Sequence, residues 1–409
     1  MLKFTIKIIY GHIKMINRLR IYQREFIKRT TETYRRYLFK EVNFNNRLIG
    51  IVGARGVGKT TFLIQYLKSS PLQFQEKLYV SVDVLGVNSL FDIAFEFYKE
   101  GGKLLIFDEI HKYKNFEQEL KNIYDMLDLK VIFSGSSAIK LDHAKGDLSR
   151  RVRVYEMQGL SFREFLEIKK EITLPTFEIE NLLENHINIA NELLLEFDLF
   201  QEWKSYLKYG YYPFYFENHE DYLIKLTETV NTVIESDIPS IFSMDYSNVV
   251  LLKKLVTLVC TSNPYKPNMR TLLEKMEMKS DYNRLYKYLY YLHKGKIITL
   301  VGAKSRGDLI FSKPEKIYLN NTNLHYAYCD QPEIGTIREV FFRSMLFKYS
   351  LSVPNRGDFF VENRYTFEVG GKNKTQKQIK GIDNAYVVAD DIEIGSPAKI
   401  PLWLFGFLY

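Results

Sequence analysis

Cysteine is scarce in this sequence. Among 409 residues only Cys260 and Cys329 occur, far apart in the chain and without a CxxC or Cys/His motif. Disulfide-rich domains and zinc modules need regularly spaced cysteines, so this pattern predicts neither a disulfide framework nor a zinc site.

Long uninterrupted apolar runs are also missing near the start of the chain. Residues 1–20 begin with apolar character, but Lys3, Lys7, His12 and Lys14 interrupt it, and no small-residue cleavage site follows. We therefore expect neither a signal peptide nor a membrane span, and we predict a protein of the reducing cytoplasm. Internal repeats at a fixed period and low-complexity tracts are absent from the sequence as well.

The composition is that of a folded globular protein. Hydrophobic residues make up 46% of the chain, charged residues 26% and aromatic residues 15%. A chain of 409 residues is too long for one ordinary core, so two or three domains are expected. The formal net charge of +8 permits an anionic partner such as nucleic acid without requiring one.

Much of the basic excess lies in residues 1–45, which we predict to be a basic helical segment. Its basic residues stand among aromatic and aliphatic ones: Arg18, Arg20, Arg24, Lys28, Arg29, Arg35, Arg36 and Lys40. This pattern suits an amphipathic helix that touches phosphates or an acidic protein surface. It also suits a solvated helix face packed on the next domain.

Short apolar runs alternate with longer mixed segments across residues 46–160. The runs predicted as strands are residues 48–53, 77–83, 103–110, 130–136 and 152–157. The segments predicted as helices, with apolar residues at helical spacing, are 60–70, 89–101 and 115–127. Strands that alternate with helices predict an α/β domain built on a parallel sheet.

The string GARGVGKT follows the first strand and precedes a helix, which is the context a P-loop requires. Glycines allow backbone amides to turn toward phosphates, and the start of the helix adds the positive end of its dipole. Lys59 is predicted to bridge the β and γ phosphates and Thr60 to ligate magnesium. The residues predicted to bind the nucleotide here are Gly53, Ala54, Arg55, Gly56, Val57, Gly58, Lys59, Thr60 and Thr61.

An acidic pair, Asp108 and Glu109, stands at the carboxyl end of a strongly apolar strand. Such a pair is often only a solvated strand end, but after a P-loop it predicts a hydrolytic site. Asp108 is expected to orient magnesium or its water, and Glu109 to polarise the attacking water.

Two later groups of residues could complete this site. Ser134, Ser136 and Ser137 follow the next strand, where they could contact the γ phosphate or the lytic water, or simply form a turn. Arg150 and Arg151 could be a surface pair, or one of them could act as an arginine finger in a neighbouring subunit. We favour Arg151 for that role.

Residues 161–330 are predicted to be a helical region. Three short helices, 251–260, 270–278 and 281–296, precede two runs suited to a hairpin, 297–303 and 309–319. This order is typical of a winged helix. If the third helix reads a groove in nucleic acid, the residues expected to face it are Asn283, Arg284, Lys287 and Tyr288; packing is the alternative.

The order of these motifs resembles a known family. GARGVGKT, LLIFDEI, GSSA, LSRR and GLSFREFL follow one another as in prokaryotic AAA-type ATPases that bear a C-terminal domain of unknown function. The resemblance extends to the chain end. It implies ATP as the nucleotide, an AAA-like core, a winged-helix segment and a restriction-endonuclease-like domain over residues 331–409. The family usually has a glycine before the arginine that corresponds to Arg151, where this chain has Arg150.

The C-terminal domain is predicted to be small and α/β, with a helix over 339–349 and strands over 358–363, 365–371 and 384–391. If it resembles a nuclease, the resemblance implies that Glu339, Asp358 and Glu368 gather a metal ion. This chain departs from the usual pattern, because Gly370 stands two residues after Glu368 and the nearest lysine is Lys372, expected on the same strand face. Active nuclease, degenerate docking module and structural carboxylates remain open. A basic strip suits docking or solubility: Lys374, Lys377 and Lys380.

The sequence therefore predicts an AAA-type P-loop ATPase that hydrolyses ATP with Mg²⁺ and couples its nucleotide state to movement of its other domains. Nucleic acid is the substrate that the basic charge and the winged-helix pattern favour. One alternative is a nucleotide-gated module that binds a protein partner and turns ATP over slowly. Another is an ATP-linked, magnesium-dependent nuclease. An arginine finger acting between subunits would require a homo-oligomer.

Overall fold

A computed structural model describes residues 2–83, 89–135, 148, 150–242, 244–261, 267–278, 281–303 and 313–409, with side chains from Met15 onward. These residues form two compact units, 1–158 and 159–409. The sequence suggested four segments, with boundaries near residues 46, 161 and 331. The structure differs because the N-terminal helix shares the core of the first sheet, and because the last strands share one unit with the helices that precede them.

The first unit is built on a five-stranded sheet with the order β2-β3-β4-β1-β5, in which every pair is parallel. All five predicted strands are confirmed: β1 Leu48–Val52, β2 Lys77–Ser81, β3 Leu104–Asp108, β4 Lys130–Gly135 and β5 Arg153–Glu156. The four strands β1 to β4 are almost entirely buried, as expected for a sheet covered on both faces.

The helices of the first unit include the three predicted between the strands. They are α1 Leu2–Arg29, α2 Leu38–Glu41, α3 Lys59–Ser69, α4 Leu90–Lys99 and α5 Phe116–Met126, with 3-10 turns at Phe74–Glu76 and Ile110–Lys112. The amino end of α4 is capped by Ser89, whose side chain accepts a hydrogen bond from the Asp92 amide. Apolar faces of these helices complete one core with the strands.

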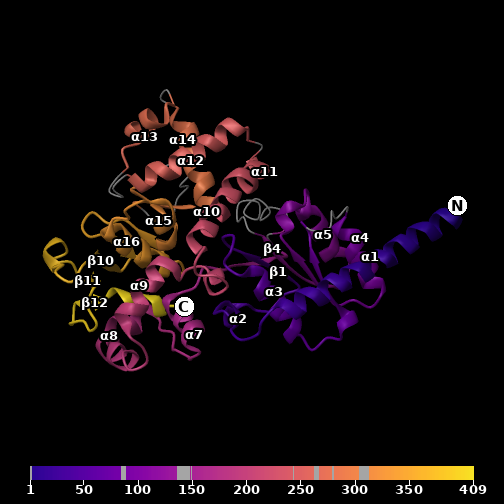
Figure 1. The fold of residues 1–409 in the computed structure, drawn as a ribbon, viewed down its shortest axis with the longest axis horizontal. Helices are drawn as coiled ribbons and strands as arrows, with labels where there is room; N and C mark the ends of the chain where they lie inside the picture. The colour runs from indigo at the N-terminus through magenta and orange to yellow at the C-terminus, as the bar shows by residue number, and fades with distance from the viewer. Residues whose placement is uncertain are drawn as a thin grey trace. The chain divides into compact units, whose positions relative to one another are not determined.

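The basic N-terminal residues do not share a single helix, which corrects the sequence-based expectation. Helix α1 ends at Arg29 and packs along β2, α3 and α4 (Figure 1). On α1, Arg20 forms an ion pair of 2.9 Å with Glu100, and the Arg24 guanidinium lies 4.9 Å from the centre of the Phe74 ring. Arg36 lies beyond the helix and is buried. The packed alternative therefore describes this segment better than a free phosphate-binding face.

The second unit contains most of the helices. They are α7 Phe162–Lys170, α8 Ile179–Leu193, α9 Leu199–Tyr209, α10 Tyr222–Thr232, α11 Ile238–Phe242, α12 Tyr246–Thr261, α13 Met269–Met276, α14 Tyr282–Lys294, α15 Thr322–Tyr328 and α16 Ile334–Met345. The predicted three short helices are α12, α13 and α14. The predicted hairpin is the antiparallel pair β6 Ile298–Val301 and β7 Lys316–Leu319, while positions 309–312 of its second run lie outside the described residues.

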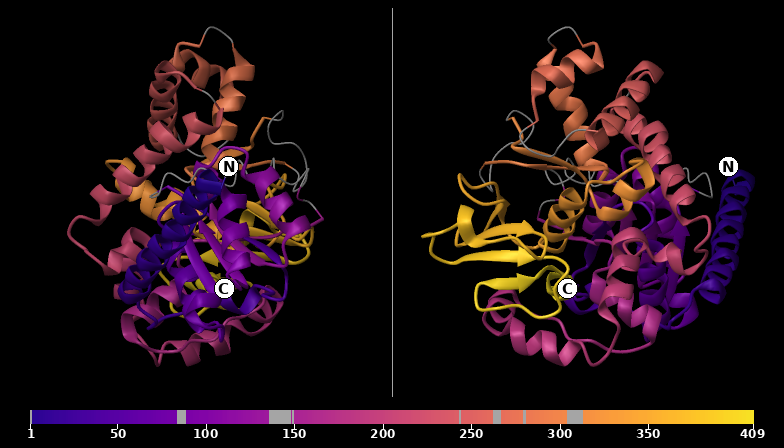
Figure 2. Two further views of the ribbon diagram at one scale, coloured as in Figure 1. Left: turned by 90° about the vertical axis from the view of Figure 1, so that its right-hand side faces the viewer. Right: turned by 60° about the vertical axis from the view of Figure 1, so that its left-hand side comes forward.

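A second five-stranded sheet ends the chain, with the order β12-β11-β10-β9-β8. Its strands are β8 Leu351–Ser352, β9 Phe359–Val361, β10 Tyr365–Gly370, β11 Ala385–Ala389 and β12 Lys399–Pro401. The three predicted strands are present, and the two that the sequence did not reveal have only 2 and 3 residues. Figure 2 shows this sheet in yellow and orange. Helix α16 packs on β10 through Phe342, whose ring centre is 5.1 Å from that of Phe367.

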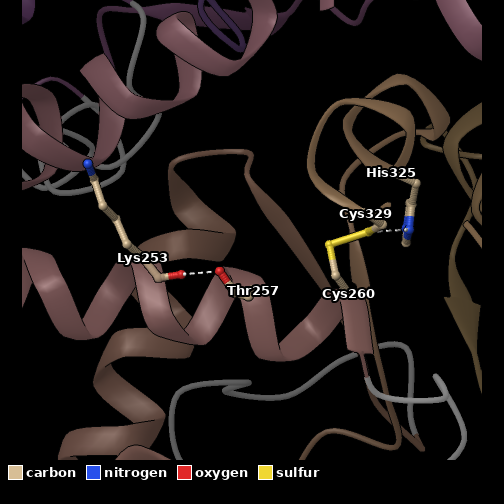
Figure 3. Close-up of a disulfide and its surroundings, with 5 residues drawn as sticks. All are labelled: Lys253, Thr257, Cys260, His325 and Cys329. Atoms are coloured by element: carbon tan, nitrogen blue, oxygen red, sulfur yellow. Dashed lines mark hydrogen bonds between the residues drawn. A yellow bond between two sulfur atoms is a disulfide. The ribbon is translucent and has the colours of Figure 1, made fainter. Parts of the chain in front are cut away.

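The two cysteines are bonded to each other, a single pairing that their sequence pattern did not predict. Cys260 near the end of α12 and Cys329 after α15 form a disulfide with their Cα atoms 5.4 Å apart (Figure 3). The pairing joins positions 69 residues apart, and only the packing of α12 against α15 brings them together. Nδ1 of the buried His325 lies 3.8 Å from the Cys329 sulfur.

Within the part of the chain that the structure describes, no helix combines the length and the apolar character needed to cross a bilayer.

Candidate active site

The P-loop connects the end of β1 at Val52 with the start of α3 at Lys59. Gly58, the residue before the helix, has φ of 96°, a left-handed conformation that strongly favours glycine. A Cβ atom on Gly53 would lie 2.3 Å from the Met157 carbonyl oxygen, so this position also requires glycine. The loop therefore has the tight, glycine-dependent backbone on which phosphate binding by main-chain amides depends.

Lys59 is only 5% exposed and lies within the loop itself. Its ammonium group donates hydrogen bonds to the carbonyl oxygens of Gly53, at 3.2 Å, and Ala54, at 2.9 Å. A buried ammonium group at the amino end of a helix creates a strongly positive position for an anion. The other predicted residues of the loop differ in exposure: Arg55 is half-buried and Thr61 is exposed.

The P-loop and the acidic pair converge as predicted. The Thr60 hydroxyl donates a hydrogen bond of 2.6 Å to Oδ2 of Asp108, across 48 residues of sequence. In the sheet, β4 separates β1 from β3. Because these strands are parallel, their carboxyl ends meet at one edge, and the loop after β1 reaches the end of β3 there.

Ser134 contacts the acidic pair directly. Its buried hydroxyl donates to Oδ1 of Asp108 and accepts a hydrogen bond of 3.1 Å from the Glu109 amide. Ser134 therefore lies beside the acidic pair, and its hydroxyl contacts the Asp108 carboxylate. Ser136 and Ser137, the other two predicted serines, lie outside the described residues.

Glu109 has an unusual backbone conformation, with φ of 56° and ψ of 38°. Residues other than glycine rarely adopt this left-handed region. Nδ1 of His111, which is buried, lies 3.5 Å from the Glu109 carboxylate. His111 was not among the predicted site residues, because a single histidine after an acidic pair carries no motif.

Tyr79 was also missed by the sequence-based prediction. It lies on β2, next to β3, and its hydroxyl donates a hydrogen bond of 2.6 Å to Oδ2 of Asp108. Burial raises the pKa of Tyr79 far above its usual range, and the negative charge of Asp108 raises it further. The phenol therefore stays protonated near neutral pH and donates to the carboxylate. The one sequence signal was its place on a strand beside the acidic pair.

Arg36 connects the P-loop with the end of the first unit. Its guanidinium donates to the carbonyl oxygens of Val57, at 2.8 Å, and Gln158, at 2.9 Å. Arginine can bridge two acceptors because its donors form a rigid planar fork. One carbonyl belongs to the P-loop and the other to the last residue of the unit. This buried side chain therefore ties the loop to the end of the unit and stabilises its conformation.

The candidate arginine finger is engaged within its own unit. Arg151 makes a two-point contact with the Asp125 carboxylate of α5, at 2.8 and 3.0 Å, and Arg150 is exposed. A role for Arg151 in a neighbouring subunit remains a prediction.

The three carboxylates predicted for the C-terminal domain, Glu339 on α16, Asp358 just before β9 and Glu368 on β10, are buried and paired with lysines. The Lys316 ammonium lies 2.7 Å from Oε2 of Glu339 and 3.3 Å from Oδ1 of Asp358. The Lys374 ammonium lies 2.5 Å from Oε1 of Glu368. Burial raises the pKa of Glu368, and the charge of Asp358 raises it further. Among the described residues, no group of three acidic, histidine or cysteine side chains is arranged to hold a metal ion.

Lys372, expected on the same strand face as Glu368, lies beyond the end of the strand. Strand β10 ends at Gly370, so Lys372 no longer follows the alternation of the strand. The chain turns there, and Lys374 reaches the carboxylate instead.

The face predicted for the third short helix is only partly exposed. Tyr288 is 3% exposed and its hydroxyl bonds to Asn248, so it packs inward and the prediction that it faces a groove was wrong. The Arg284 guanidinium donates to Tyr288 and to Asn248, both at 2.7 Å. Asn283 and Lys287 are exposed on α14.

One family model matches the segment that contains the P-loop. A family model described as an AAA domain matches residues 45–166. The chain is 28% identical to the uncharacterized protein MJ1637 of Methanocaldococcus jannaschii over 410 aligned residues. The alignment covers 88% of this chain and 82% of that protein.

Solved structures resemble the chain weakly. The C. elegans PCH-2 structure has a TM-score of 0.23 at 16% identity, covering 43% of this chain and 47% of that one. The S. cerevisiae Hsp104-ADP complex has a TM-score of 0.26 at 17% identity, covering 68% and 41%. AMPPCP-bound DnaA from Aquifex aeolicus has a TM-score of 0.23 at 16% identity, covering 63% and 85%.

The domain match and the site geometry point in the same direction. The matched segment contains the P-loop, the acidic pair and all five strands of the parallel sheet. Residues 45–166 thus match an AAA domain, and together with the parallel sheet and its P-loop they support an AAA-type P-loop ATPase.

Proposed function

We propose that the first unit binds ATP with Mg²⁺ and hydrolyses it. The observation that carries the proposal is the 2.6 Å hydrogen bond between Thr60 and Asp108, because it joins the P-loop to the acidic pair at one edge of the sheet. Phosphoryl transfer depends on positioning and on charge stabilisation. Both are available where a glycine loop, a buried lysine and two carboxylates meet.

The residues at this edge suit a magnesium ion. Mg²⁺ prefers hard oxygen ligands and is usually held by one or two carboxylates together with substrate phosphates. The Thr60 hydroxyl and the Asp108 carboxylate supply such oxygens, already in contact with each other. When bound, the ion would offset negative charge on the phosphates.

The protein groups have separate roles in this proposal. The amides of residues 53–61 and the Lys59 ammonium would bind the phosphates, and Ser134 would hold Asp108. Glu109 would orient and polarise the attacking water. His111, close to its carboxylate, would limit the positions that the Glu109 side chain adopts.

The test is nucleotide binding and turnover by the purified chain. A fluorescent ATP analogue, with and without Mg²⁺, measures affinity, and released phosphate measures turnover. Lys59→Ala should lower both strongly, whereas Lys99→Ala, at an exposed position of α4 that pairs with Glu96, should change neither. A wild-type chain that retains no nucleotide with Mg²⁺ present would refute the proposal.

We propose that ATP binding and hydrolysis change the conformation of the second unit, and that this unit acts on nucleic acid. We place this activity in the cytoplasm, where ATP is available. The net charge of +8 and exposed Asn283 and Lys287 on α14, in the winged-helix arrangement that we infer for α12 to α14, support the action on nucleic acid. Turnover stimulated by duplex or single-stranded DNA, with the stimulation fading as salt rises, is the expected result. Stimulation by a protein partner alone would favour the alternative of a slow, nucleotide-gated binding module.

A nuclease activity of a restriction-endonuclease-like C-terminal domain is less well supported. Lys316 and Lys374 already neutralise the carboxylates that a metal ion would need. The arrangement favours a docking or structural role for this sheet. Magnesium-dependent DNA cleavage that persists in Lys59→Ala and disappears in Asp358→Asn would reverse this interpretation.

A further inference from the structure

Asp108 is held by donors from several segments. Oδ2 accepts hydrogen bonds from Thr60 and Tyr79, both at 2.6 Å. Oδ1 accepts from the Ser134 hydroxyl and, at 3.1 Å, from the Glu109 amide. Thr60, Ser134 and Glu109 belong to the P-loop and the two strand ends already considered. Tyr79 comes from the neighbouring edge strand and has no place in those motifs.

Tyr79 is well suited to orient a carboxylate. Its side chain is 2% exposed, and its ring has few rotamers once it is packed, so the hydroxyl points in one direction. A hydrogen bond from a neutral phenol to a charged carboxylate is stronger than one between neutral groups. The donor therefore restrains Asp108 without adding a charge to the site.

Helix α1 holds Tyr79 at its backbone. Strand β2 lies at the edge of the sheet, so within the described part of the chain its outer amide and carbonyl groups have no neighbouring strand. Gln23, fully buried on α1, replaces that strand: Oε1 accepts from the Tyr79 amide at 2.8 Å, and Nε2 donates to the Lys77 carbonyl at 3.3 Å.

Helix α1 also holds Tyr79 at its ring. The Phe26 ring centre lies 5.0 Å from that of Tyr79, with the planes tilted by 55°. One turn of α1 thus contacts both ends of the residue whose hydroxyl reaches Asp108. The path from α1 to Asp108 is direct and continuous.

We propose that Tyr79 is a positioning residue for the magnesium site, orienting Asp108 through its hydroxyl, and that α1 determines this orientation through Gln23 and Phe26. The inference rests on the proposed ATPase function. It assigns the basic N-terminal helix a role inside the catalytic unit. Displacement of α1 would misorient Asp108 and so weaken the apparent affinity of the nucleotide site for Mg²⁺.

The first experiment compares Tyr79→Phe with wild type. The apparent affinity for Mg²⁺ in ATP turnover should fall about tenfold, whereas nucleotide binding without Mg²⁺ and the melting temperature should stay near wild type. The matched control is Tyr113→Phe, which removes another phenol-to-carboxylate hydrogen bond of the same unit, to Glu119 at 2.6 Å. This control should keep the wild-type magnesium dependence.

A double-mutant cycle separates positioning from general packing. In an Asp108→Asn background, Tyr79→Phe should cause no further change in magnesium dependence, because its effect passes through that carboxylate. A structural role would cause the same loss in both backgrounds. Equal losses would overturn the inference, as would a wild-type response in the single variant.

Gln23→Leu tests the contribution of α1 without changing the site and serves if Tyr79→Phe does not fold. It removes the two hydrogen bonds to β2 and should shift the magnesium dependence in the same direction, by less than Tyr79→Phe. An unchanged response refutes the role of α1. If the wild-type chain binds MgATP and these variants match it, the inference alone fails. If the wild-type chain does not bind MgATP, the proposed function fails as well.

Discussion

The hydroxyl of Thr60 and Oδ2 of Asp108 lie 2.6 Å apart, although one residue begins a helix after β1 and the other ends β3. The contact places a hydroxyl and a carboxylate oxygen side by side at the edge of the sheet, which is what the proposed magnesium site requires.

Replacing Asp108 with asparagine should weaken magnesium-dependent nucleotide binding about 10- to 100-fold, because the amide keeps the shape and removes the charge. Binding titrations at several Mg²⁺ concentrations measure the effect. Asp128→Asn is the control, since the Asp128 side chain is 90% exposed. Equal magnesium dependence in the two variants would contradict the assignment.

Glu109→Gln should lower turnover about 100-fold or more while MgATP binding persists, because the amide cannot polarise a water molecule as a base. Single-turnover measurements separate binding from hydrolysis. An exposed glutamate of the second unit provides the control variant, Glu274→Gln. Rapid hydrolysis by Glu109→Gln would require a different residue to activate the water.

Arg36→Lys should destabilise the first unit by about 1–3 kcal/mol, because a lysine ammonium cannot bridge both carbonyls as the guanidinium does. The acceptors concerned belong to Val57 and Gln158. Denaturant unfolding of the full chain measures the change. Its exposed neighbour gives the matched variant, Arg35→Lys, for which no comparable loss is expected. Similar unfolding curves for both variants would argue against a stabilising role of the two Arg36 hydrogen bonds.

Reduction of the Cys260–Cys329 disulfide should lower the free energy of unfolding of the second unit by about 4 kcal/mol, the loop-entropy contribution for a closed loop of 69 residues. Melting curves with and without a reducing agent test this. The double variant Cys260→Ser with Cys329→Ser should not respond to the reducing agent. Two titratable thiols in the native, untreated chain would show that the bond does not form.

His325 should make the second unit sensitive to acid. Burial lowers its pKa from 6.5 to about 4. Between these values the unfolded chain binds the proton and the folded chain does not, so stability is present above pH 6.5 and decreases as the pH falls toward 4. The full difference amounts to about 3 kcal/mol.

Unfolding measured between pH 7 and pH 4 checks this expectation. The decrease in stability should be smaller in His325→Gln than in wild type, and His219→Gln, at an exposed position, should behave as wild type. The same acid response in all three chains would assign it to other groups.

Local patterns predicted much of the first unit. The five strands and the three helices between them are continuous segments with clear periodicity, and β1 to β4 are buried by neighbours on both sides. The three short helices and the hairpin of the second unit followed from the same kind of pattern. Strands β8 and β12 could not be predicted, since 2 or 3 residues carry no periodicity.

The candidate site was predictable where its residues are adjacent in the sequence. The glycines of the P-loop, Lys59, Thr60 and the acidic pair lie in two short strings, and the rules for parallel sheets indicated that the strings meet. Tyr79, Arg36 and His111 carry no such motif. Their importance appears only when the contacts to Asp108, Val57 and Glu109 are known.

The sequence by itself determined the parallel sheet and the chemical character of its edge, because strand formation and loop conformation depend on neighbours within a few residues. Only the tertiary structure decided which distant residues meet: the disulfide across 69 residues, Lys374 rather than Lys372 at Glu368, and Gln23 at the edge of β2. Such pairings depend on how helices and strands pack in three dimensions, and a one-dimensional pattern does not encode those distances directly.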